Sequence, residues 1–206
     1  MSVVLSIHLR PKSEDLVKIN GMKTTKEQGN MSTIRFEAKL FKIGSWTLLS
    51  LPKSASAMLP SRGMTMVEGT INDFRFQAAL EPDGRGSHWF RLDKALCKAA
   101  NAAAGDTVTL AIEPIEEWSE PKIPEDLKSA LLSAPEAYKV WMDITPMARW
   151  DWIRWIRSTS NPETRKKRIV VACSKLKSGM RRPCCFNRSM CTEPEVSKNG
   201  VLLDPA

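Results

Sequence analysis

Two adjacent cysteines near the carboxyl end, Cys184 and Cys185, follow the arginines Arg181 and Arg182. Nearby guanidinium groups lower the pKa of a cysteine, so these thiols could act as thiolates in redox chemistry. They could also bind zinc, although zinc ligands usually occur as Cys-x2–4-Cys pairs and no histidine lies near. A third interpretation is that the cysteines and Phe186 pack as small hydrophobic side chains. The sequence favours packing, leaves the reactive alternatives open and assigns no metal ligand.

A glycine-containing segment, residues 83–88, holds the residue types of a hydrolase triad in Asp83, Ser87 and His88. A working triad needs a base in reach of the nucleophile and an acid behind the base, usually on separate loops. Residues this close in sequence seldom meet that geometry, so we expect a hairpin turn with a packed histidine. No catalytic residue and no cofactor site is assigned, and we expect a protein that is not an enzyme.

Positive charge concentrates in residues 154–188, which carry eleven Lys or Arg against the single acid Glu163, whereas acids outnumber bases in residues 116–153. Such a segment could bind phosphate groups of a nucleic acid or a membrane surface, and it could equally be a solvated helical face. We expect it to contact an acidic partner, whether protein, nucleic acid or membrane surface, through Arg165, Lys166, Lys167, Arg168, Arg181 and Arg182.

Two other functions stay open as alternatives. The first is a nucleic-acid-binding regulator, although no recognised DNA- or RNA-binding motif accompanies the basic residues. The second is a thiol protein that uses Cys184 and Cys185 for redox chemistry or metal binding.

The composition is that of an ordinary globular protein: 206 residues, 42% hydrophobic and 26% charged, with a formal net charge of +8. No window approaches the roughly 18 apolar residues of a membrane helix, so we expect no transmembrane segment. The amino-terminal residues lack the pattern of a secretory signal, which predicts a cytoplasmic protein whose five cysteines are free thiols. The sequence does not indicate the oligomeric state.

Residues 33–114 have the pattern of a small β domain. Ile34, Phe36 and Ala38 alternate with charged residues, which is typical of a half-buried strand. Turn residues end each apolar run, and Asn72-Asp73 predicts a hairpin. We expect strands near residues 34–42, 45–51, 65–71, 74–80, 87–92 and 107–113, with short helices near 54–59 and 93–103. Many short strands with two helical caps predict a closed barrel.

The remaining sequence predicts an acidic, proline-containing linker at residues 115–123 and a helical region at 124–188. Helix starts are indicated at Pro124, Ser133 with Glu136, Thr145-Pro146 and Asn161-Pro162. In the last helix a buried stripe of Ile169, Ala172, Cys173 and Leu176 is expected, with Gly179 at its end.

The two ends of the chain have no such patterns. We expect residues 1–32 to form a flexible leader, with Met31 as the natural start, and residues 189–206 to form a flexible tail. The fold class predicted overall is α+β, with a β-barrel followed by a helical segment.

The order of the motifs in the first half resembles a small bacterial domain family of unknown function, which forms a double-split β-barrel similar in shape to AbrB-like regulators and MazE antitoxins. The motifs are Phe36-x-Ala38-x-Leu40, Ser50-Leu51-Pro52, Val67-x-Gly69-Thr70-Ile71-Asn72, Pro82-Asp83-Gly84-x-Gly86-x-His88 and Gly105-Asp106-x-Val108. Asp73 departs from the pattern, which often has glycine after the asparagine. The leader has no counterpart in the family.

The second half resembles the bacteriocin-protection YdeI/OmpD-associated family. Its motifs are Pro124-Glu125-Asp126-Leu127, Trp155-Ile156, Glu163-Thr164-Arg165-x-x-Arg168-Ile169 and the Arg-Arg-Pro-Cys-Cys-Phe sequence that begins at Arg181. The resemblance implies a role in tolerance of bacteriocins or cationic antimicrobial peptides. Neither family has an established catalytic residue, so none is carried over to this sequence.

Overall fold

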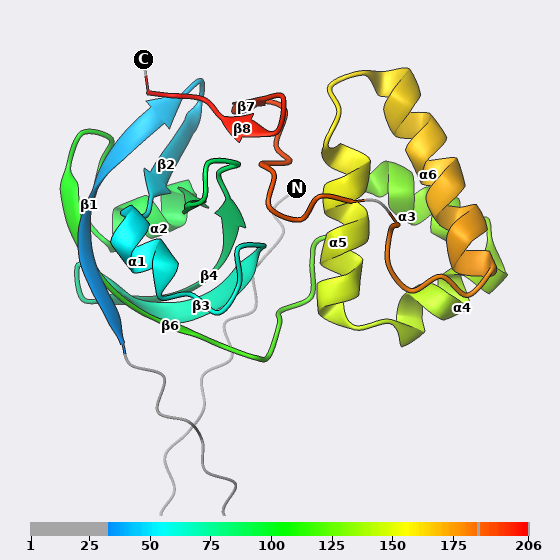
Figure 1. Ribbon diagram of the computed structural model, residues 1–206, viewed down its shortest axis with the longest axis horizontal. Coiled ribbons are helices and arrows are strands. Elements are labelled where there is room, and N and C mark those ends of the chain that lie inside the picture. The colour runs from blue at the N-terminus through cyan, green and yellow to red at the C-terminus, as the bar shows by residue number, and fades with distance from the viewer. Residues whose placement is uncertain (1–32, 185, 206) are drawn as a thin grey trace, which may run out of the picture. The chain divides into compact units, whose positions relative to one another are not determined.

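A computed structural model of the chain describes residues 33–184 and 186–205. The predicted leader, the predicted start at Met31 and Cys185 lie outside the described residues. The fold is α+β, as predicted, with a closed β-barrel followed by a group of helices (Figure 1). None of the helices that the structure describes is both long enough and apolar enough to span a bilayer.

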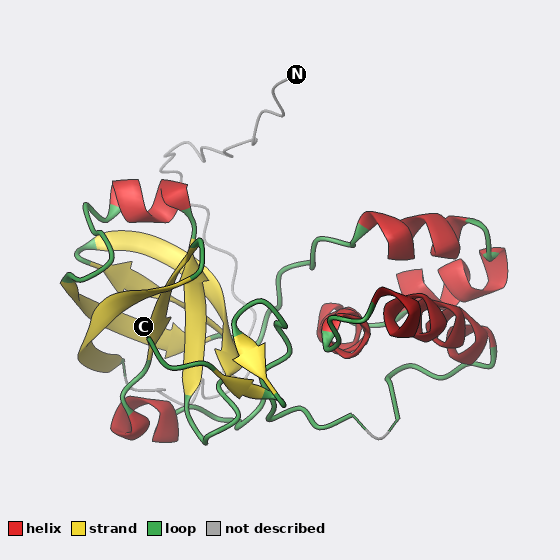
Figure 2. Ribbon diagram, turned by 90° about the horizontal axis from the view of Figure 1, so that it is seen from above, coloured by secondary structure: helices red, strands yellow, loops and turns green. Residues whose placement is uncertain are grey.

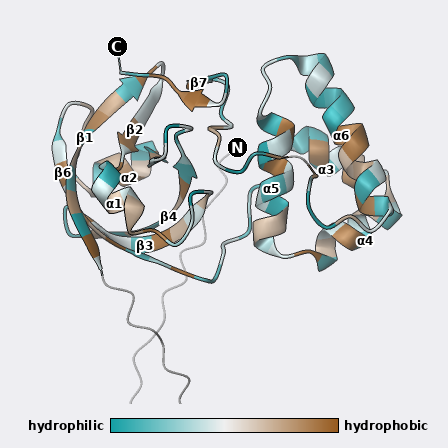
Figure 3. Ribbon diagram, in the orientation of Figure 1, coloured by the Kyte–Doolittle hydropathy of each residue, from teal (hydrophilic) through white to brown (hydrophobic). Residues whose placement is uncertain are grey.

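The barrel closes in the strand order β1-β2-β5-β4-β3-β6, with antiparallel pairing between neighbours. Each strand begins and ends within two residues of its predicted position. The strands are β1 (Ile34–Ile43), β2 (Trp46–Ser50), β3 (Thr65–Ile71), β4 (Phe74–Pro82), β5 (His88–Leu92) and β6 (Thr107–Pro114). Hydrophobic and hydrophilic residues alternate along β1 and β6 (Figure 3), because one face of each of these strands lines the core.

Two of the strands divide their pairing between two neighbours. Strand β1 pairs with β6 over residues 34–39 and with β2 over residues 40–43. Strand β4 likewise pairs with β3 over residues 74–80 and with β5 over residues 81–82. Two divided strands are the doubly split arrangement that the family resemblance implies.

Local backbone geometry explains the residue types at one turn and at one strand contact of the barrel. Asn72 and Asp73 both adopt positive φ angles, 44° and 65°, which is the geometry of a tight β-hairpin turn and confirms the predicted hairpin. Gly69 on β3 lies so close to β6 that a β-carbon at this position would overlap the carbonyl oxygen of Ala111. The contact between these two strands therefore requires glycine.

Two short helices, α1 (Lys53–Ala57) and α2 (Lys94–Ala99), cover opposite ends of the barrel (Figures 1 and 2). Ala55 and Ala100 contribute to the barrel core from these two ends. Helix α2 begins where predicted, because the Asp93 carboxylate accepts a hydrogen bond from the backbone N–H of Leu96. It ends earlier than predicted, shortly before Asn101, whose positive φ of 47° is incompatible with a continuing helix.

Four helices follow the barrel: α3 (Glu125–Leu132), α4 (Pro135–Asp143), α5 (Pro146–Arg157) and α6 (Pro162–Lys177). They share one core, in which Trp141, Trp152 and the predicted stripe of α6 are buried, with Cys173 half-buried at its edge. The predicted starts of α5 and α6 are confirmed, because Thr145 and Asn161 cap them through their side chains.

The predicted capping pair Ser133 and Glu136 is wrong. Ser133 instead ends helix α3, and its hydroxyl donates to the carbonyl oxygen of Ser129. Helix α4 begins after Ala134 without a side-chain cap, because Pro135 occupies its first position and has no N–H to satisfy.

The predicted flexible tail at residues 189–206 is also wrong over the residues that the structure describes. It forms a small hairpin of β7 (Ser197–Lys198) and β8 (Val201–Leu202). Three of its side chains are buried against Leu48 and Trp89 of the barrel, namely those of Cys191, Val196 and Leu202. The sequence does not indicate this packing, because the three apolar side chains are spread over twelve residues without a helix or strand period. Each of them nevertheless packs against the barrel.

Candidate functional site

Most of the six cations predicted to bind a partner lie in ion pairs within the helical region. Arg165 forms a two-pronged pair with Asp126 of α3, at 2.7 and 3.0 Å. Lys166 pairs with Glu163 at 2.9 Å, and Arg181 pairs with Asp143 at 2.6 Å. Arg182 lies 3.4 Å from Asp151 of α5. The acids of residues 116–153 and the bases of residues 154–188 therefore fold against one another.

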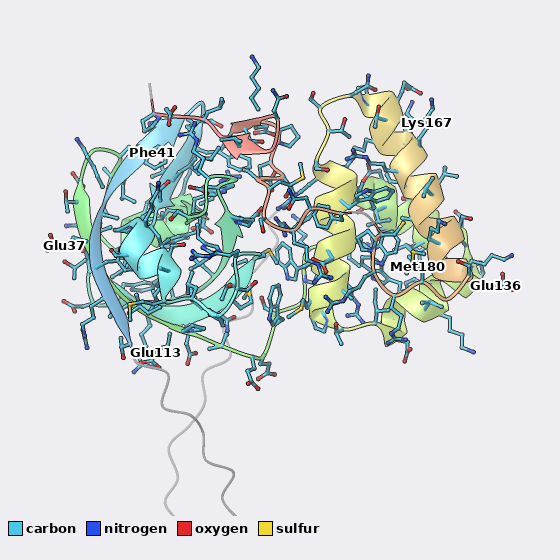
Figure 4. The ribbon with its side chains drawn as sticks, in the orientation of Figure 1. Glu37, Phe41, Glu113, Glu136, Lys167 and Met180 are labelled. Carbon is cyan, nitrogen blue, oxygen red and sulfur yellow. The ribbon has the colours of Figure 1, made fainter. Side chains whose placement is uncertain are left out.

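The other two predicted cations have different environments. Arg168 donates to the carbonyl oxygen of Trp155 and to the hydroxyl of Ser158, both at 2.7 Å, and its guanidinium lies over the Trp155 ring. Lys167 is exposed on α6 (Figure 4) and has no ion pair among the described residues. The same is true of Lys175, which the sequence analysis did not select. The structure thus places the six cations on one helical region without making them one free cluster.

The exposed pairs hold their charges in the ionised form. A hydrogen bond from Arg165 lowers the pKa of Asp126, and a hydrogen bond from Arg181 lowers that of Asp143. Glu136 of α4 and Lys177 of α6 form a further pair at 2.6 Å. Hydrogen bonding in this pair lowers the pKa of the acid and raises that of the base. The pairs of Arg165 and Lys177 join α6 to α3 and α4, and the pair of Arg181 joins the segment after α6 to α4.

The thiols occupy separate environments. Cys184 is exposed, whereas Cys191 is buried in the contact between the tail hairpin and the barrel, where burial raises its pKa. Phe186 is half-buried, with the guanidinium of Arg154 over its ring. The predicted packing of Cys184 as a small hydrophobic side chain is wrong, because this thiol is exposed. Within residues 33–184 and 186–205 no three His, Cys, Asp or Glu side chains gather closely enough to hold a metal ion.

The residues of the apparent triad do not come together. Asp83 accepts hydrogen bonds from the backbone N–H groups of Arg85 and Ser87, and the Ser87 hydroxyl donates to the carbonyl oxygen of Leu51. His88 is fully buried, with Nδ1 2.8 Å from the hydroxyl of Ser56 and Nε2 2.8 Å from the carbonyl oxygen of Gly63. Burial lowers the pKa of His88. Asp83 therefore stabilises its own turn, whereas Ser87 and His88 contact α1 and the segments on either side of it.

A buried group of charged side chains was not predicted from the sequence. It lies on helix α5, where Asp151, Arg154 and Arg157 project toward the barrel and the tail. The Arg157 guanidinium lies 2.5 Å from Glu81 of β4 and 2.6 Å from Glu193 of the tail. It also donates to the hydroxyl of Thr192. This single side chain connects the barrel, helix α5 and the tail.

Arg154 is the least satisfied member of this group. It has 0% exposure, and its Nη2 donates to the carbonyl oxygens of Arg188 and Met190 at 3.2 and 2.9 Å. Its Nε lies 3.8 Å from Glu81, too far for a hydrogen bond, and neither Nε nor Nη1 has a hydrogen-bond partner among the described residues. Burial lowers the pKa of Arg154.

The acids of the buried group also have altered pKa values. Burial raises the pKa of Glu193 to about 7, since desolvation outweighs the attraction of Arg157 and Glu81 adds repulsion. Burial likewise raises the pKa of Asp151, although Arg188 and Arg182 lie 3.0 and 3.4 Å from it. Asp151 is 5% exposed. The group therefore combines strong ion pairs with one incompletely satisfied cation.

A sequence signal for this group did exist. In Trp150–Arg157 the charged residues recur at every third position between apolar ones, which places Asp151, Arg154 and Arg157 on one side of the helix. Trp152, Ile153 and Ile156 on the opposite side are buried in the helical core. Such a pattern indicates a helix whose apolar face is buried in one core and whose charged face contacts a second domain. The partners Glu81 and Glu193 could not be identified from it, because they lie far away in the sequence.

Comparison with known protein families agrees with this two-part architecture. Residues 36–112 match the family model described as domain of unknown function (DUF1905), which covers the barrel. Residues 120–179 match the model described as Bacteriocin-protection, YdeI or OmpD-Associated, which covers the four helices. No curated protein matches the chain. The chain is thus similar to the DUF1905 model over its barrel and to the bacteriocin-protection, YdeI or OmpD-associated model over its four helices.

Proposed function

We propose that this is a non-enzymatic cytoplasmic protein that contributes to tolerance of bacteriocins or cationic antimicrobial peptides, and that its helical domain contacts an acidic partner. The description of the matched family supports the tolerance role. The charge of the helical domain supports the contact.

The observation that carries the proposal is the positive charge that remains after the helices have folded. Residues 116–188 contain fifteen Lys or Arg and nine Asp or Glu. Internal pairing therefore leaves an excess of cations. On helix α6 Lys167 and Lys175 are exposed and have no ion pair among the described residues. An excess of this kind attracts anionic surfaces over several ångströms.

Several of the internal pairs can also exchange their partners. The side chains of Lys166, Lys177 and Arg181 are 73, 67 and 54% exposed, and those of their acids are 69, 69 and 72% exposed. Exposed ion pairs contribute about 0 to 1 kcal/mol, so a nearby acidic surface can replace the internal acid at little cost. Lys166 and Arg181, two of the six residues predicted from the sequence, thus remain available to a partner.

Support for a non-enzymatic function comes from the engagement of the apparent catalytic residues. The Ser87 hydroxyl and both ring nitrogens of His88 are occupied by buried hydrogen bonds. A nucleophile and its base need to be free to meet a substrate. The free cysteines of the described residues are in keeping with a reducing compartment.

A survival assay tests the proposal. Cells that lack the protein are expected to survive a bacteriocin or a cationic peptide less well, and the native chain should restore survival. The variant Lys167→Glu/Lys175→Glu should not restore it, because the change removes the exposed cations of α6 that have no ion pair among the described residues. The matched control Lys94→Glu/Lys98→Glu makes the same charge change on helix α2 of the barrel, where both lysines are exposed, and should restore survival.

Each result bears on the proposal. Equal survival with and without the native chain would exclude the tolerance role. Full restoration by Lys167→Glu/Lys175→Glu would exclude the acidic contact on α6. Binding of the purified protein to duplex DNA, to anionic vesicles or to an acidic protein, measured at two salt concentrations, identifies the class of partner, because such contacts weaken with salt.

A further inference from the structure

A cavity of about 350 Å³ lies beside the buried charged group. Its walls come from the segment before and at the start of β3, the segment that leaves β6, and helix α5. Three methionines, Met64, Met66 and Met147, line it together with Trp118. Arg154 also lines the cavity, as do Asp151 and Arg188. A volume of this size suits a small organic ligand.

The unsatisfied hydrogen-bonding capacity of Arg154 is the main reason to expect a ligand. A fully buried guanidinium with two nitrogens unpaired is costly, because charged donors removed from water need acceptors. Glu81 cannot supply them, since its carboxylate lies 2.5 Å from Arg157 and 3.8 Å from Nε of Arg154. An acceptor brought by a ligand would complete the hydrogen bonding of Arg154.

The charges around the cavity limit the charge of that ligand. Arg154 and Arg188 line it with positive charge, whereas Asp151 and the exposed Glu116 line it with negative charge. Asp151 is already paired with Arg182 and Arg188. The lining therefore favours a single negative charge over two, because a dianion would be repelled by the two carboxylates.

The remaining walls select the rest of the ligand. Met64 and Met66 are 7 and 2% exposed, and Met147 and Trp118 are half-buried. Methionine side chains are flexible and polarisable, and they adapt to apolar groups of different shapes. A short hydrocarbon chain or a small ring would fill the space beside these side chains.

We propose that this cavity binds a monoanionic amphiphile, a carboxylate with a short apolar group, whose oxygens accept hydrogen bonds from Arg154. The site requires neither the acidic partner nor the tolerance role proposed above. It is a small-molecule site enclosed by the barrel, the linker and helix α5.

Isothermal titration calorimetry with octanoate tests the proposal, with 1-octanol as the uncharged probe and acetate as the probe without a chain. The full-length protein should bind octanoate more tightly than either. Arg154→Met keeps the length of the side chain and removes its charge. It should weaken octanoate binding by about tenfold to a hundredfold, the usual effect of losing a charge-assisted hydrogen bond. Binding of 1-octanol should change less than about twofold.

A second variant addresses the cavity itself. Met147→Trp fills the space while Arg154 stays in place, and it should abolish binding of both octanoate and 1-octanol. Met142→Trp makes the same substitution on α4, at a residue that is 55% exposed and does not line the cavity, and should leave binding unchanged. Absence of octanoate binding to the native protein, unchanged octanoate binding in Arg154→Met, or tighter binding of octyl phosphate than of octanoate would overturn the proposal.

Discussion

Arg157 on helix α5 donates a hydrogen bond to Glu81 on strand β4 at 2.5 Å, across 76 residues of sequence. The same guanidinium lies 2.6 Å from Glu193 in the tail. The arginine side chain is 16% exposed, and the side chains of Glu81 and Glu193 are 11 and 18% exposed. One cation therefore balances two carboxylates at the meeting point of the barrel, the helical domain and the carboxyl-terminal hairpin.

Replacing this arginine should destabilise the whole chain. Arg157→Met leaves Glu81 and Glu193 without their closest cation, and breaking a buried pair in this way costs about 3 to 5 kcal/mol. Urea denaturation followed by circular dichroism measures the loss. Arg165→Met is the matched control, because it breaks the more exposed pair with Asp126 and should cost less than about 1 kcal/mol. Equal losses in the two variants would contradict the structural role of Arg157.

The buried carboxyl of Glu193 should make stability depend on pH. Its pKa is about 7 in the folded chain, against the ordinary value of 4.5. Between these values the folded state binds more protons than the unfolded state, so the contribution of Glu193 to stability is present below pH 4.5 and is lost as the pH rises through 7. One pKa unit corresponds to about 1.4 kcal/mol, so the change totals about 3 kcal/mol.

The comparison with Glu193→Gln isolates this effect. His88 and Asp151 also titrate, but their contributions occur in both proteins and cancel in the difference. The free energy of unfolding of Glu193→Gln minus that of the native chain should therefore increase between about pH 4.5 and pH 7 and then level off. A difference that does not vary with pH would show that Glu193 is not buried as described.

The docking of the tail can be tested at two neighbouring leucines. Leu202 is 6% exposed in the contact with the barrel, whereas Leu203 is 39% exposed. Leu202→Ala should reduce the free energy of unfolding by about 2 to 4 kcal/mol, through lost burial and the cavity left behind. Leu203→Ala should cost less than about 1 kcal/mol. A flexible tail would make the two substitutions equivalent.

Thiol labelling provides an independent measure of the same contact. Cys184 is exposed, whereas Cys191 is 1% exposed and burial raises its pKa. Mass spectrometry after brief alkylation near pH 8 should find Cys184 modified and Cys191 protected, because the thiolate is the reacting form. Leu202→Ala should increase labelling of Cys191. Rapid modification of Cys191 in the native chain would show that the hairpin does not cover it.

Gly69 offers a test of the barrel. Gly69→Ala places a methyl group against the backbone carbonyl of Ala111, which can yield only if β3 and β6 separate. We expect a loss of about 3 kcal/mol, the upper range for overpacking, measured as a lower midpoint in urea. The control Gly63→Ala places its methyl group at ordinary contact distance from Ser61 and Arg188. A small effect of Gly69→Ala would mean that the two strands lie farther apart.

Sequence patterns predicted the elements of this fold well. Strands β1 and β6 alternate with period two, and the β3–β4 turn depends on Asn72 and Asp73, whose backbone preferences are local. Thr145 and Asn161 cap their helices through hydrogen bonds that span three residues. Interactions of this kind involve neighbours along the chain, so they can be read without knowing the fold.

One helix start and the burial of the tail residues could not be predicted from the sequence. Ser133 and Glu136 fit a capping pattern, yet they do not cap helix α4. The Ser133 hydroxyl donates to the carbonyl oxygen of Ser129 instead, and Pro135 begins α4 without a side-chain cap. In the tail, Leu202 and Val196 are buried because of hydrophobic surface on the distant strands β2 and β5. No local pattern specifies such a surface, which forms only when the barrel closes.

By itself, the sequence determined the barrel, the four helices and an excess of positive charge after residue 153. Only the tertiary structure decided which of those charges are buried, which are paired and which remain exposed. Arg157 and Lys167 are both cations in the same basic segment, yet one is enclosed by Glu81 and Glu193 and the other faces solvent. The physical reason is that the environment of a charge depends on groups brought near it through space, and those come from distant parts of the chain.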